Sequence, residues 1–282
     1  MKYRIDLRNE LTVITVLALV SSLAGCSSAP TPSTGEVGGE ITFRYSLEEG
    51  DVLKYEGYGN REMQFQGMSM ETIHSDRISI TYDHETDDGN LLVDLKYLES
   101  SDKMVRLDGY EEIDAPVKPE GRTISVTLSP KGEVLNAGGF IVGISGKNGI
   151  KNYVDKWFFE LPEDPVKVGD TWEREIDEED ERGKITGLAR LELKKIEYKD
   201  GIEVAVIDVD YEGQIISETP SGKMTGTNEG ESTFKIAVKG GYIVESSGSS
   251  DFKGAIVSED ASGGEQKQKI TVVNDDKVKL CK

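Results

Sequence analysis

Alternating apolar and polar residues, in short segments separated by glycine turns, most strongly limit the folds open to this chain. The period-two pattern occurs at residues 41–45 (ITFRY), 78–82 (ISITY), 124–128 (ISVTL) and 234–238 (FKIAV). Such alternation is typical of strands with one buried face. Tight turns such as Asp88-Gly89 and Asp200-Gly201 favour antiparallel hairpins. We therefore predict a mainly β protein, built as an antiparallel meander or half-barrel.

Three landmarks recur in the same order in two parts of the chain, which predicts an internal duplication. The segments 50–55, 88–97 and 121–135 correspond to the segments 169–174, 200–208 and 230–244. Any antiparallel protein could give one such match by chance, but three in order favour two related β halves. We place these halves at residues 41–147 and 162–282.

One segment between the halves has the periodicity of a helix. Its apolar residues are Ile150, Tyr153, Val154, Trp157, Phe158 and Leu161. Spacings of three and four residues form the apolar stripe of an amphipathic helix. Asn148 could cap the start of this helix, and Pro162 would end it. We expect a bridging helix over residues 148–161, either as a movable lid over a curved sheet or as a crossover that fills the core.

The N-terminal residues 1–25 have the pattern of a signal peptide. Lys2, Arg4 and Arg8 form a basic region, and residues 11–23 form an apolar run. This run is too short to span a bilayer comfortably. We therefore expect export of the chain from the cytoplasm.

The sequence Leu23-Ala24-Gly25-Cys26 directly follows the apolar run and resembles the lipobox of bacterial and archaeal lipoproteins. The resemblance implies cleavage before Cys26 and lipidation of its thiol, as by palmitate, so that the lipid holds the mature chain to a membrane. A plain secretory signal is the alternative. Residues 26–40, which are rich in Ser, Thr, Pro and Gly, then form a flexible tether. The expected location is extracytoplasmic, at a membrane that depends on the organism's envelope.

Residues 161–172 (LPEDPVKVGDTW) follow the expected helix. With the strands around them, they resemble an uncharacterised family of prokaryotic lipoproteins with an L-P-x-x-P-V-K-x-G-D-x-W signature. This resemblance covers residues 41–282 and implies no known activity. The architecture is also distantly similar to the lipoprotein carriers of the Lol system, in which a half-open β-barrel with a helical lid holds acyl chains. Those carriers have one half-barrel, whereas this chain has two predicted halves.

The charge of the chain excludes one class of partner. It has 33 Lys and Arg against 53 Asp and Glu, a net charge of −20. Such a surface repels phosphate groups, so we expect no nucleic-acid partner. The acidity either attracts cationic partners or keeps an exposed protein soluble.

Motifs for catalysis and metal binding are missing from the sequence. It contains no H-x-x-x-H pair, no G-x-S-x-G elbow and no phosphate-binding loop. We expect a non-catalytic protein without cofactor or metal. An enzyme would become the better interpretation if the fold placed His74 or His84 beside a carboxylate in a cleft.

A group of soft apolar residues, Met63, Phe65, Met68 and Met70, suits either an adaptable pocket or a packed core. We predict a lipoprotein that binds an apolar or amphiphilic ligand, such as a lipid, between a curved sheet and the bridging helix. The expected ligand-binding residues are Tyr153, Trp157, Phe158, Met63 and Phe65. The alternative is a structural or interaction protein that holds another envelope protein with its acidic face or its sheet edges.

Overall fold

The computed structural model describes residues 39–65, 67–106, 111–114, 119–139, 150–151, 154–180, 183–219, 222–259 and 264–281. The predicted signal peptide and most of the predicted tether, including Cys26, lie outside the described residues. Within these ranges, no helix is both long enough and apolar enough to cross a membrane.

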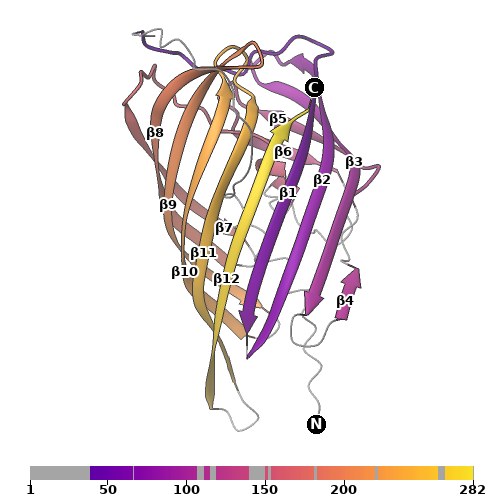
Figure 1. The fold of residues 1–282 in the computed structure, drawn as a ribbon, viewed down its shortest axis with the longest axis vertical. Coiled ribbons are helices and arrows are strands. Elements are labelled where there is room, and N and C mark those ends of the chain that lie inside the picture. The colour runs from indigo at the N-terminus through magenta and orange to yellow at the C-terminus, as the bar shows by residue number, and fades with distance from the viewer. Residues whose placement is uncertain are drawn as a thin grey trace.

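Twelve strands form one antiparallel sheet, which confirms the predicted fold class. They are β1 (Val52–Phe65), β2 (Met68–Glu85), β3 (Leu91–Arg106), β4 (Glu111–Asp114), β5 (Thr123–Leu128), β6 (Val134–Gly138), β7 (Thr171–Asp180), β8 (Gly183–Lys199), β9 (Ile202–Thr219), β10 (Gly222–Ala237), β11 (Ile243–Glu259) and β12 (Glu265–Leu280). Their order is β6-β5-β3-β2-β1-β12-β11-β10-β9-β8-β7, and β4 pairs with β3. The sheet is not closed, and Figure 1 shows it as a strongly curved wall.

The first and last strands, β1 and β12, meet in the middle of this sheet. Their register runs from Tyr55 opposite Leu280 to Phe65 opposite Ile270. Strands β1 to β6 therefore form one wing of the sheet and β7 to β12 form the other (Figure 1). The pairing of β1 with β12 is what joins the two wings.

The turns that open the two wings make matching backbone hydrogen bonds. The N–H of Gly50 donates to the carbonyl of Tyr82 at 3.0 Å, and the N–H of Gly169 donates to the carbonyl of Leu193 at 2.8 Å. Both glycines have positive φ, at 88° and 92°. A left-handed backbone of this kind favours glycine because it lacks a Cβ atom.

The aspartate after each of these glycines repeats its role as well. The carboxylate of Asp51 accepts a hydrogen bond from the N–H of Glu48 at 2.8 Å. The carboxylate of Asp170 accepts one from the N–H of Lys167 at 3.0 Å. In each case the aspartate N–H also donates to the carbonyl of the same residue three positions earlier, at 2.9 and 3.0 Å, so both bonds close the same four-residue turn before β1 and before β7. The predicted relation between the two halves is therefore visible at the level of single hydrogen bonds.

One apolar core contains residues of both wings. Tyr55 and Leu95 of the first wing pack in the same cluster as Leu193 and Ile207 of the second. All four side chains are almost completely buried. The two related halves thus share a single core on the concave face of the sheet.

The expected helix over residues 148–161 is wrong in extent. Among its described residues, only 150–151 and 154–155 are helical. The N–H of Trp157 donates to the carbonyl of Val154 at 3.0 Å, a bond between residues three apart that tightens and ends the turn. From residue 158 onward the chain is no longer helical.

Residues outside the strands supply hydrogen bonds to this segment, namely Tyr45 before β1 and Lys131 in the turn between β5 and β6. The N–H of Phe159 donates to the hydroxyl of Tyr45 at 3.0 Å, and the N–H of Leu161 donates to the carbonyl of Lys131 at 2.7 Å. Trp157, Phe159 and Leu161 are all buried. Because the concave sheet surrounds this segment, its side chains need not gather on one helical face.

A second apolar cluster lies on the same concave face, towards the arrowhead of β1 in Figure 1. We call it the methionine cluster, and its buried members are Met63, Phe65, Met70, Met104, Ile215, Met224, Phe252, Ile256, Ile270 and Val272. Seven strands contribute to it, so both wings of the sheet line this cluster as well.

Candidate functional site

Between the core and the methionine cluster, the concave face is lined by small and polar residues. One row crosses six strands and contains Asp102, His74, Gly59, Asp276, Gly248 and Ser232 as successive neighbours. We define the polar belt as Arg61, His74, Asp76, Asp102, Asn228, Ser232, Ser250, Asn274 and Asp276. Alternation along each strand places these side chains on the same face as the two apolar clusters.

His74 of β2 stands between two carboxylates. Its Nδ1 atom is hydrogen-bonded to Oδ1 of Asp102 on β3. Its Nε2 atom lies 2.7 Å from Oδ2 of Asp76 on the same strand. The side chain of Asp76 is fully shielded from solvent, and that of His74 is 23% exposed. The imidazole therefore has an acidic partner at each ring nitrogen.

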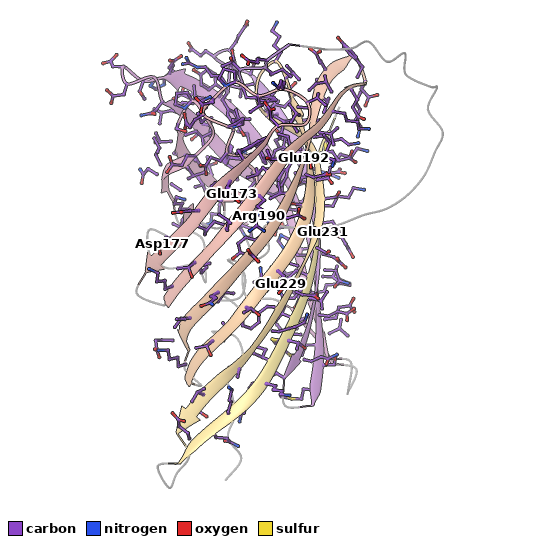
Figure 2. The ribbon with its side chains drawn as sticks, turned by 90° about the vertical axis from the view of Figure 1, so that its left-hand side faces the viewer. Glu173, Asp177, Arg190, Glu192, Glu229 and Glu231 are labelled. Carbon is purple, nitrogen blue, oxygen red and sulfur yellow. The ribbon has the colours of Figure 1, made fainter. Side chains whose placement is uncertain are left out.

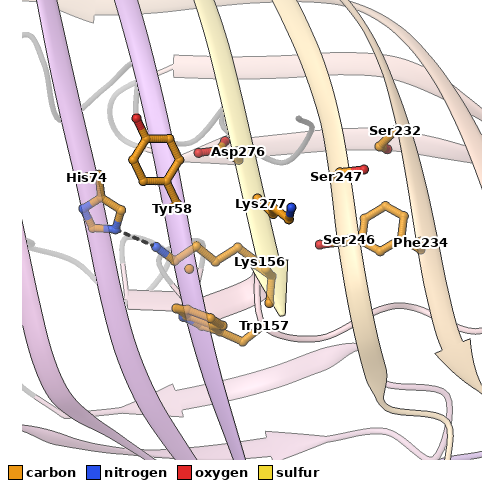
Figure 3. A pocket seen from close by; sticks show the side chains of 12 residues that line it. Tyr58, His74, Lys156, Trp157, Ser232, Phe234, Ser246, Ser247, Asp276 and Lys277 are labelled. Atoms are coloured by element: carbon orange, nitrogen blue, oxygen red, sulfur yellow. Dashed lines mark hydrogen bonds between the residues drawn. The ribbon is translucent and has the colours of Figure 1, made fainter. Parts of the chain in front are cut away.

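Lys156 brings a positive charge from the segment after residue 154 to this group. Its Nζ atom donates to Oδ2 of Asp76 at 3.0 Å. It also lies 3.1 Å from Nε2 of His74, the contact marked in Figure 3. The ammonium group also lies 5.0 Å from the ring centroid of Trp157. This contact fastens the segment to the sheet at the level of the belt.

These neighbours change the protonation of His74 and Asp76. Burial and the nearby Lys156 lower the pKa of His74, but Asp76 and Asp102 outweigh them, so that its pKa is raised above the ordinary value. Burial raises the pKa of Asp76, but Lys156 and His74 outweigh it and hold that pKa far below the usual range. At neutral pH Asp76 is ionised, and the raised pKa favours the charged form of His74.

Asp276 of β12 behaves differently. Burial raises its pKa to about 6, and the positive charges of Lys156 and Arg61 offset only part of this effect. Next to it, Nε of Arg61 donates to Oδ1 of Asn274 at 2.8 Å, and the Asn274 amide donates to Oγ of Ser250 at 3.1 Å. Asp276 is thus a carboxyl group close to its titration point under ordinary conditions.

A small hollow opens beside the belt, with a volume of about 40 Å³. His74, Lys156 and Asp276 line its polar side, whereas Trp157 and Phe234 line its apolar side (Figure 3). By the usual measure of about 10–15 Å³ for each water, roughly three water-sized groups fit.

Glycines on β1 allow Trp157 and the polar belt to lie close to the backbone of the sheet. A Cβ atom at Gly57 would come within 2.7 Å of Cη2 of Trp157, and one at Gly59 within 2.2 Å of Oδ1 of Asp276. Real Cβ atoms do not tolerate such distances. The indole ring and the carboxylate therefore lie directly over the backbone of β1.

Several buried acceptor atoms of the belt have no hydrogen-bond partner among the described residues. They are Oδ1 of Asp76, Oδ1 of Asn228, Oγ of Ser232 and Oδ2 of Asp276. Leaving a buried polar atom unsatisfied costs about 1–3 kcal/mol. Most buried polar atoms in folded proteins are hydrogen-bonded, so four unsatisfied atoms on one face call for an explanation.

The residues expected to bind a ligand fall into two separate places. Trp157 and Phe158 belong to the shared core, whereas Met63 and Phe65 belong to the methionine cluster. Tyr153 lies outside the described residues. Of the four that the structure describes, only Trp157 borders the hollow. The structure therefore groups the expected residues by cluster and does not join them around one cavity.

Sequence reasoning missed the polar belt. The alternation that marks Ile78 and Tyr82 as inward-facing continues backwards in steps of two to Asp76 and His74. Extending this parity through the polar residues would have placed both on the buried face. The same parity, from Ile270 and Val272 to Val278, would have placed Asp276 on the buried face, whereas no comparable signal in the sequence points to Lys156.

The belt combines an imidazole, carboxylates and an ammonium group, but its geometry limits its chemistry. His74 does stand beside carboxylates at the edge of a hollow, which is the arrangement named above as favouring an enzyme, but both of its ring nitrogens are hydrogen-bonded to those carboxylates. Among the described residues, no three His, Cys, Asp or Glu side chains are grouped so as to hold a metal ion. The arrangement is suited to binding polar groups by hydrogen bonds.

No protein-family model and no curated protein matches the chain. One similar solved structure, of lipid–protein interactions in lipovitellin, is 10% identical with a TM-score of 0.36. The match covers 84% of this chain but 26% of the lipovitellin chain, so this chain spans about a quarter of that protein. The hypothetical lipoprotein YmcC from Escherichia coli is 12% identical with a TM-score of 0.21, over 77% of this chain and 86% of that chain. At such TM-scores neither similarity carries an argument about function.

Proposed function

We propose that this protein is an extracytoplasmic lipoprotein, held to a membrane by a lipid on Cys26, that binds an amphiphilic molecule without catalysing a reaction. The observation that supports this proposal is the order of surfaces on the concave face. The methionine cluster lies directly beside the polar belt, so one ligand could place its chain on the first and its headgroup at the second. Soft methionine side chains adapt to irregular apolar ligands.

The methionine cluster suits the apolar part of the ligand better than the segment around Trp157. Trp157 is 1% exposed, and its Nε1–H donates to the hydroxyl of Tyr97 at 3.3 Å. Its ring also packs against Tyr55, with centroids 6.1 Å apart. A side chain fixed in this way acts as part of the core. We therefore assign Met63 and Phe65 to ligand binding and Trp157 to packing.

Photo-crosslinking tests this assignment. The soluble form that begins at residue 27 is incubated with a long-chain alcohol bearing a diazirine on its chain, and labelled peptides are mapped by mass spectrometry. We expect labels in the peptides that contain Met63 to Met70 and Met224. A short-chain diazirine alcohol is the matched control. Labels confined to outward-facing residues such as Tyr198 and Val273 would contradict the proposal.

The anchor has a test of its own. In the original host, Cys26→Ala should lose the mass of the lipid and leave the membrane fraction, whereas Cys281→Ala should stay in it. Cys281 lies next to the C-terminus, beyond the last residue of β12. A Cys26→Ala protein that remained fully membrane-bound would remove the lipid anchor from the proposal.

A second candidate, an envelope interaction protein, is favoured by the convex face of β7 to β10. In Figure 2 Glu173, Glu192, Glu229 and Glu231 lie on this side, with Arg190 among them. On β9 and β10, Asp210 is opposite Glu231 and Glu212 is opposite Glu229. Like charges in direct opposition destabilise a sheet.

A cationic partner would relieve that repulsion. Crosslinking in intact cells, followed by isolation of the protein, tests this candidate. A stoichiometric basic partner that is lost when Glu229 and Glu231 are both changed to Gln would favour it over amphiphile binding. The matched control is the same double change at Glu48 and Glu49, which lie in the turn before β1 and outside strands β7 to β10.

A further inference from the structure

We propose that the hollow beside the polar belt binds an uncharged, hydroxyl-bearing headgroup of about the size of glycerol. This inference rests on the proposed function, because it names the polar part of the amphiphile that the concave face would hold. It follows from three properties of the hollow: the kind of atoms without partners, the balance of charges, and the available space.

The atoms without partners call for a donor. Two of the atoms without partners belong to residues that line the hollow, and one of them is Oδ2 of Asp276, a carboxylate oxygen. Oγ of Ser232 can accept as well as donate, and Ser232 is 6% exposed and lines the hollow. A group that brings several O–H donors would satisfy what the protein leaves open, since these oxygens have no donor among the described residues.

The charges of the belt call for a neutral group. Its carboxylates are Asp76, Asp102 and Asp276, and its cationic groups are Arg61, His74 and Lys156. Three negative and three positive charges face one another when His74 is protonated. A phosphate would meet the buried carboxylates, and an ammonium group would meet Lys156, so each would suffer like-charge repulsion in a poorly solvated place. A hydroxyl-bearing headgroup avoids both costs.

The size and the walls of the hollow fit the same class. Room for roughly three water-sized groups admits the two free hydroxyl groups of a monoacylglycerol headgroup and one of its carbon atoms. Phe234 offers apolar ring surface to its carbon atoms, opposite the polar wall. The methionine cluster begins at Met63, six residues along β1 from Gly57 at the hollow, which is about 20 Å at 3.3 Å per residue. A single acyl chain attached to the headgroup could cover this distance.

The test compares headgroups on one chain. Binding of a monoacylglycerol, of the phosphate-headed lipid and of the primary amine with the same chain is measured by native mass spectrometry and titration calorimetry, together with free glycerol. We expect the monoacylglycerol to bind at least tenfold more tightly than either charged lipid. Ser232→Ala and Asp276→Asn should each weaken it by about five- to tenfold, and Ser249→Ala on the convex face should not.

Each outcome has a distinct meaning. Equal binding of all three lipids would overturn the headgroup inference and leave the proposed amphiphile binding in place. Binding of no amphiphile would overturn both. Free glycerol that bound as tightly as the monoacylglycerol would overturn the assignment of the site to a lipid. Urea unfolding of each variant checks that the variant is folded. If Ser232→Ala did not fold, Asp276→Asn, which we expect to be stable, would still test the inference.

Discussion

At the scale of single residues, the polar belt shows how a buried charge can be kept in a sheet. Asp76 is fully shielded, yet it is ionised because His74 and Lys156 both contact its Oδ2 atom. Asp276 lacks such contacts, so burial raises its pKa and it keeps its proton to higher pH. The pKa values of two aspartates on one face are thus shifted in opposite directions because their nearest neighbours differ.

The raised pKa of Asp276 predicts a pH-dependent cost in stability. The ordinary pKa of an aspartate is 3.8, and that of Asp276 in the folded protein is about 6, so folding favours the protonated form of this carboxyl group. Its contribution is complete below about pH 4 and is lost as pH rises through 6. The loss is at most about 3 kcal/mol at pH 7.5, because one pKa unit corresponds to about 1.4 kcal/mol.

Asp276→Asn should therefore gain stability over the wild type as pH rises from 4.5 to 7.5, measured as the difference in free energy of unfolding in urea. The contributions of His74 and Asp76 are present in both proteins and largely cancel in this difference. Asp251→Asn, on the exposed side of β11, is the control. A difference between Asp276→Asn and wild type that did not change with pH would show that burial does not perturb this carboxyl group.

Gly57 gives a second prediction at this scale. Gly57→Ala places a methyl group within 2.7 Å of Cη2 of Trp157 and should cost about 1–3 kcal/mol of stability by overpacking. Trp157→Phe removes that end of the ring, so the double variant should recover part of the loss. Gly138→Ala is the control, since the nearest atom to its new methyl group is 3.9 Å away. Additive losses in the urea midpoints would contradict the contact.

At the scale of elements, the turn between β5 and β6 anchors the segment that crosses the core. The Nζ atom of Lys131 donates to the carbonyls of Phe43, Pro162 and Glu163, at 3.1, 2.7 and 2.9 Å. Gly132, with φ of 89°, passes so close to Tyr45 that a Cβ atom would lie 2.3 Å from its ring. One lysine therefore connects three parts of the chain.

Lys131→Met should lower the stability by about 2–4 kcal/mol, because it keeps the aliphatic stem but leaves three carbonyls without this charged donor. Lys239 occupies the corresponding turn between β10 and β11 and makes no side-chain hydrogen bond or ion pair with a described residue. Lys239→Met is thus the matched control. Urea unfolding of both variants gives the answer, and equal losses would mean that the three bonds to Lys131 contribute little.

Strands were easier to predict than the segment that crosses them. Alternation and glycine turns act within a few residues, so they showed the antiparallel sheet and the related halves. The stripe from Ile150 to Leu161 also predicted burial correctly, since Val154, Trp157 and Leu161 are buried. It failed to predict conformation because the hydrogen bonds of Phe159 and Leu161 go to residues more than twenty positions away. Local periodicity contains no information on such partners.

The same distinction applies to the candidate site. Met63 and Phe65 were identified as an apolar pair and do lie together in one cluster. The polar belt depends on pairing between β3, β2, β1 and β12, which a single sequence does not specify. The net acidity of the chain was visible in the sequence. Which carboxylates point inward, however, depends on the strand register, and the whole sheet sets that register.

At the scale of the whole molecule, the two halves are related in sequence yet joined into one sheet and one core. The β1–β12 pairing joins the wings over eleven residue pairs, from Tyr55 to Phe65. The core and the methionine cluster both draw residues from each wing. Neither wing could bury its concave face alone, so we expect the halves to unfold together.

The two tryptophans allow a direct test of this cooperativity. Trp157 packs on Tyr55 and Gly57 of the first wing, and Trp172 lies on β7 of the second. Trp172→Phe and Trp157→Phe therefore leave one fluorescent reporter each. The urea transitions of each variant, followed by fluorescence and by far-ultraviolet circular dichroism, should coincide.

Adding Leu95→Ala in β3 should then shift both probes equally. Leu95 is completely buried in the first wing, so its truncation should cost about 2–5 kcal/mol. In the Trp157→Phe background the remaining reporter is in the other wing, and it should report the same loss because the shared core transmits it. A Trp172 transition that stayed in place while the dichroism signal split into two steps would show two independently folding halves. The concave face, with the belt and the methionine cluster, would then be an interface between two domains, and ligand binding would depend on whether that interface is formed.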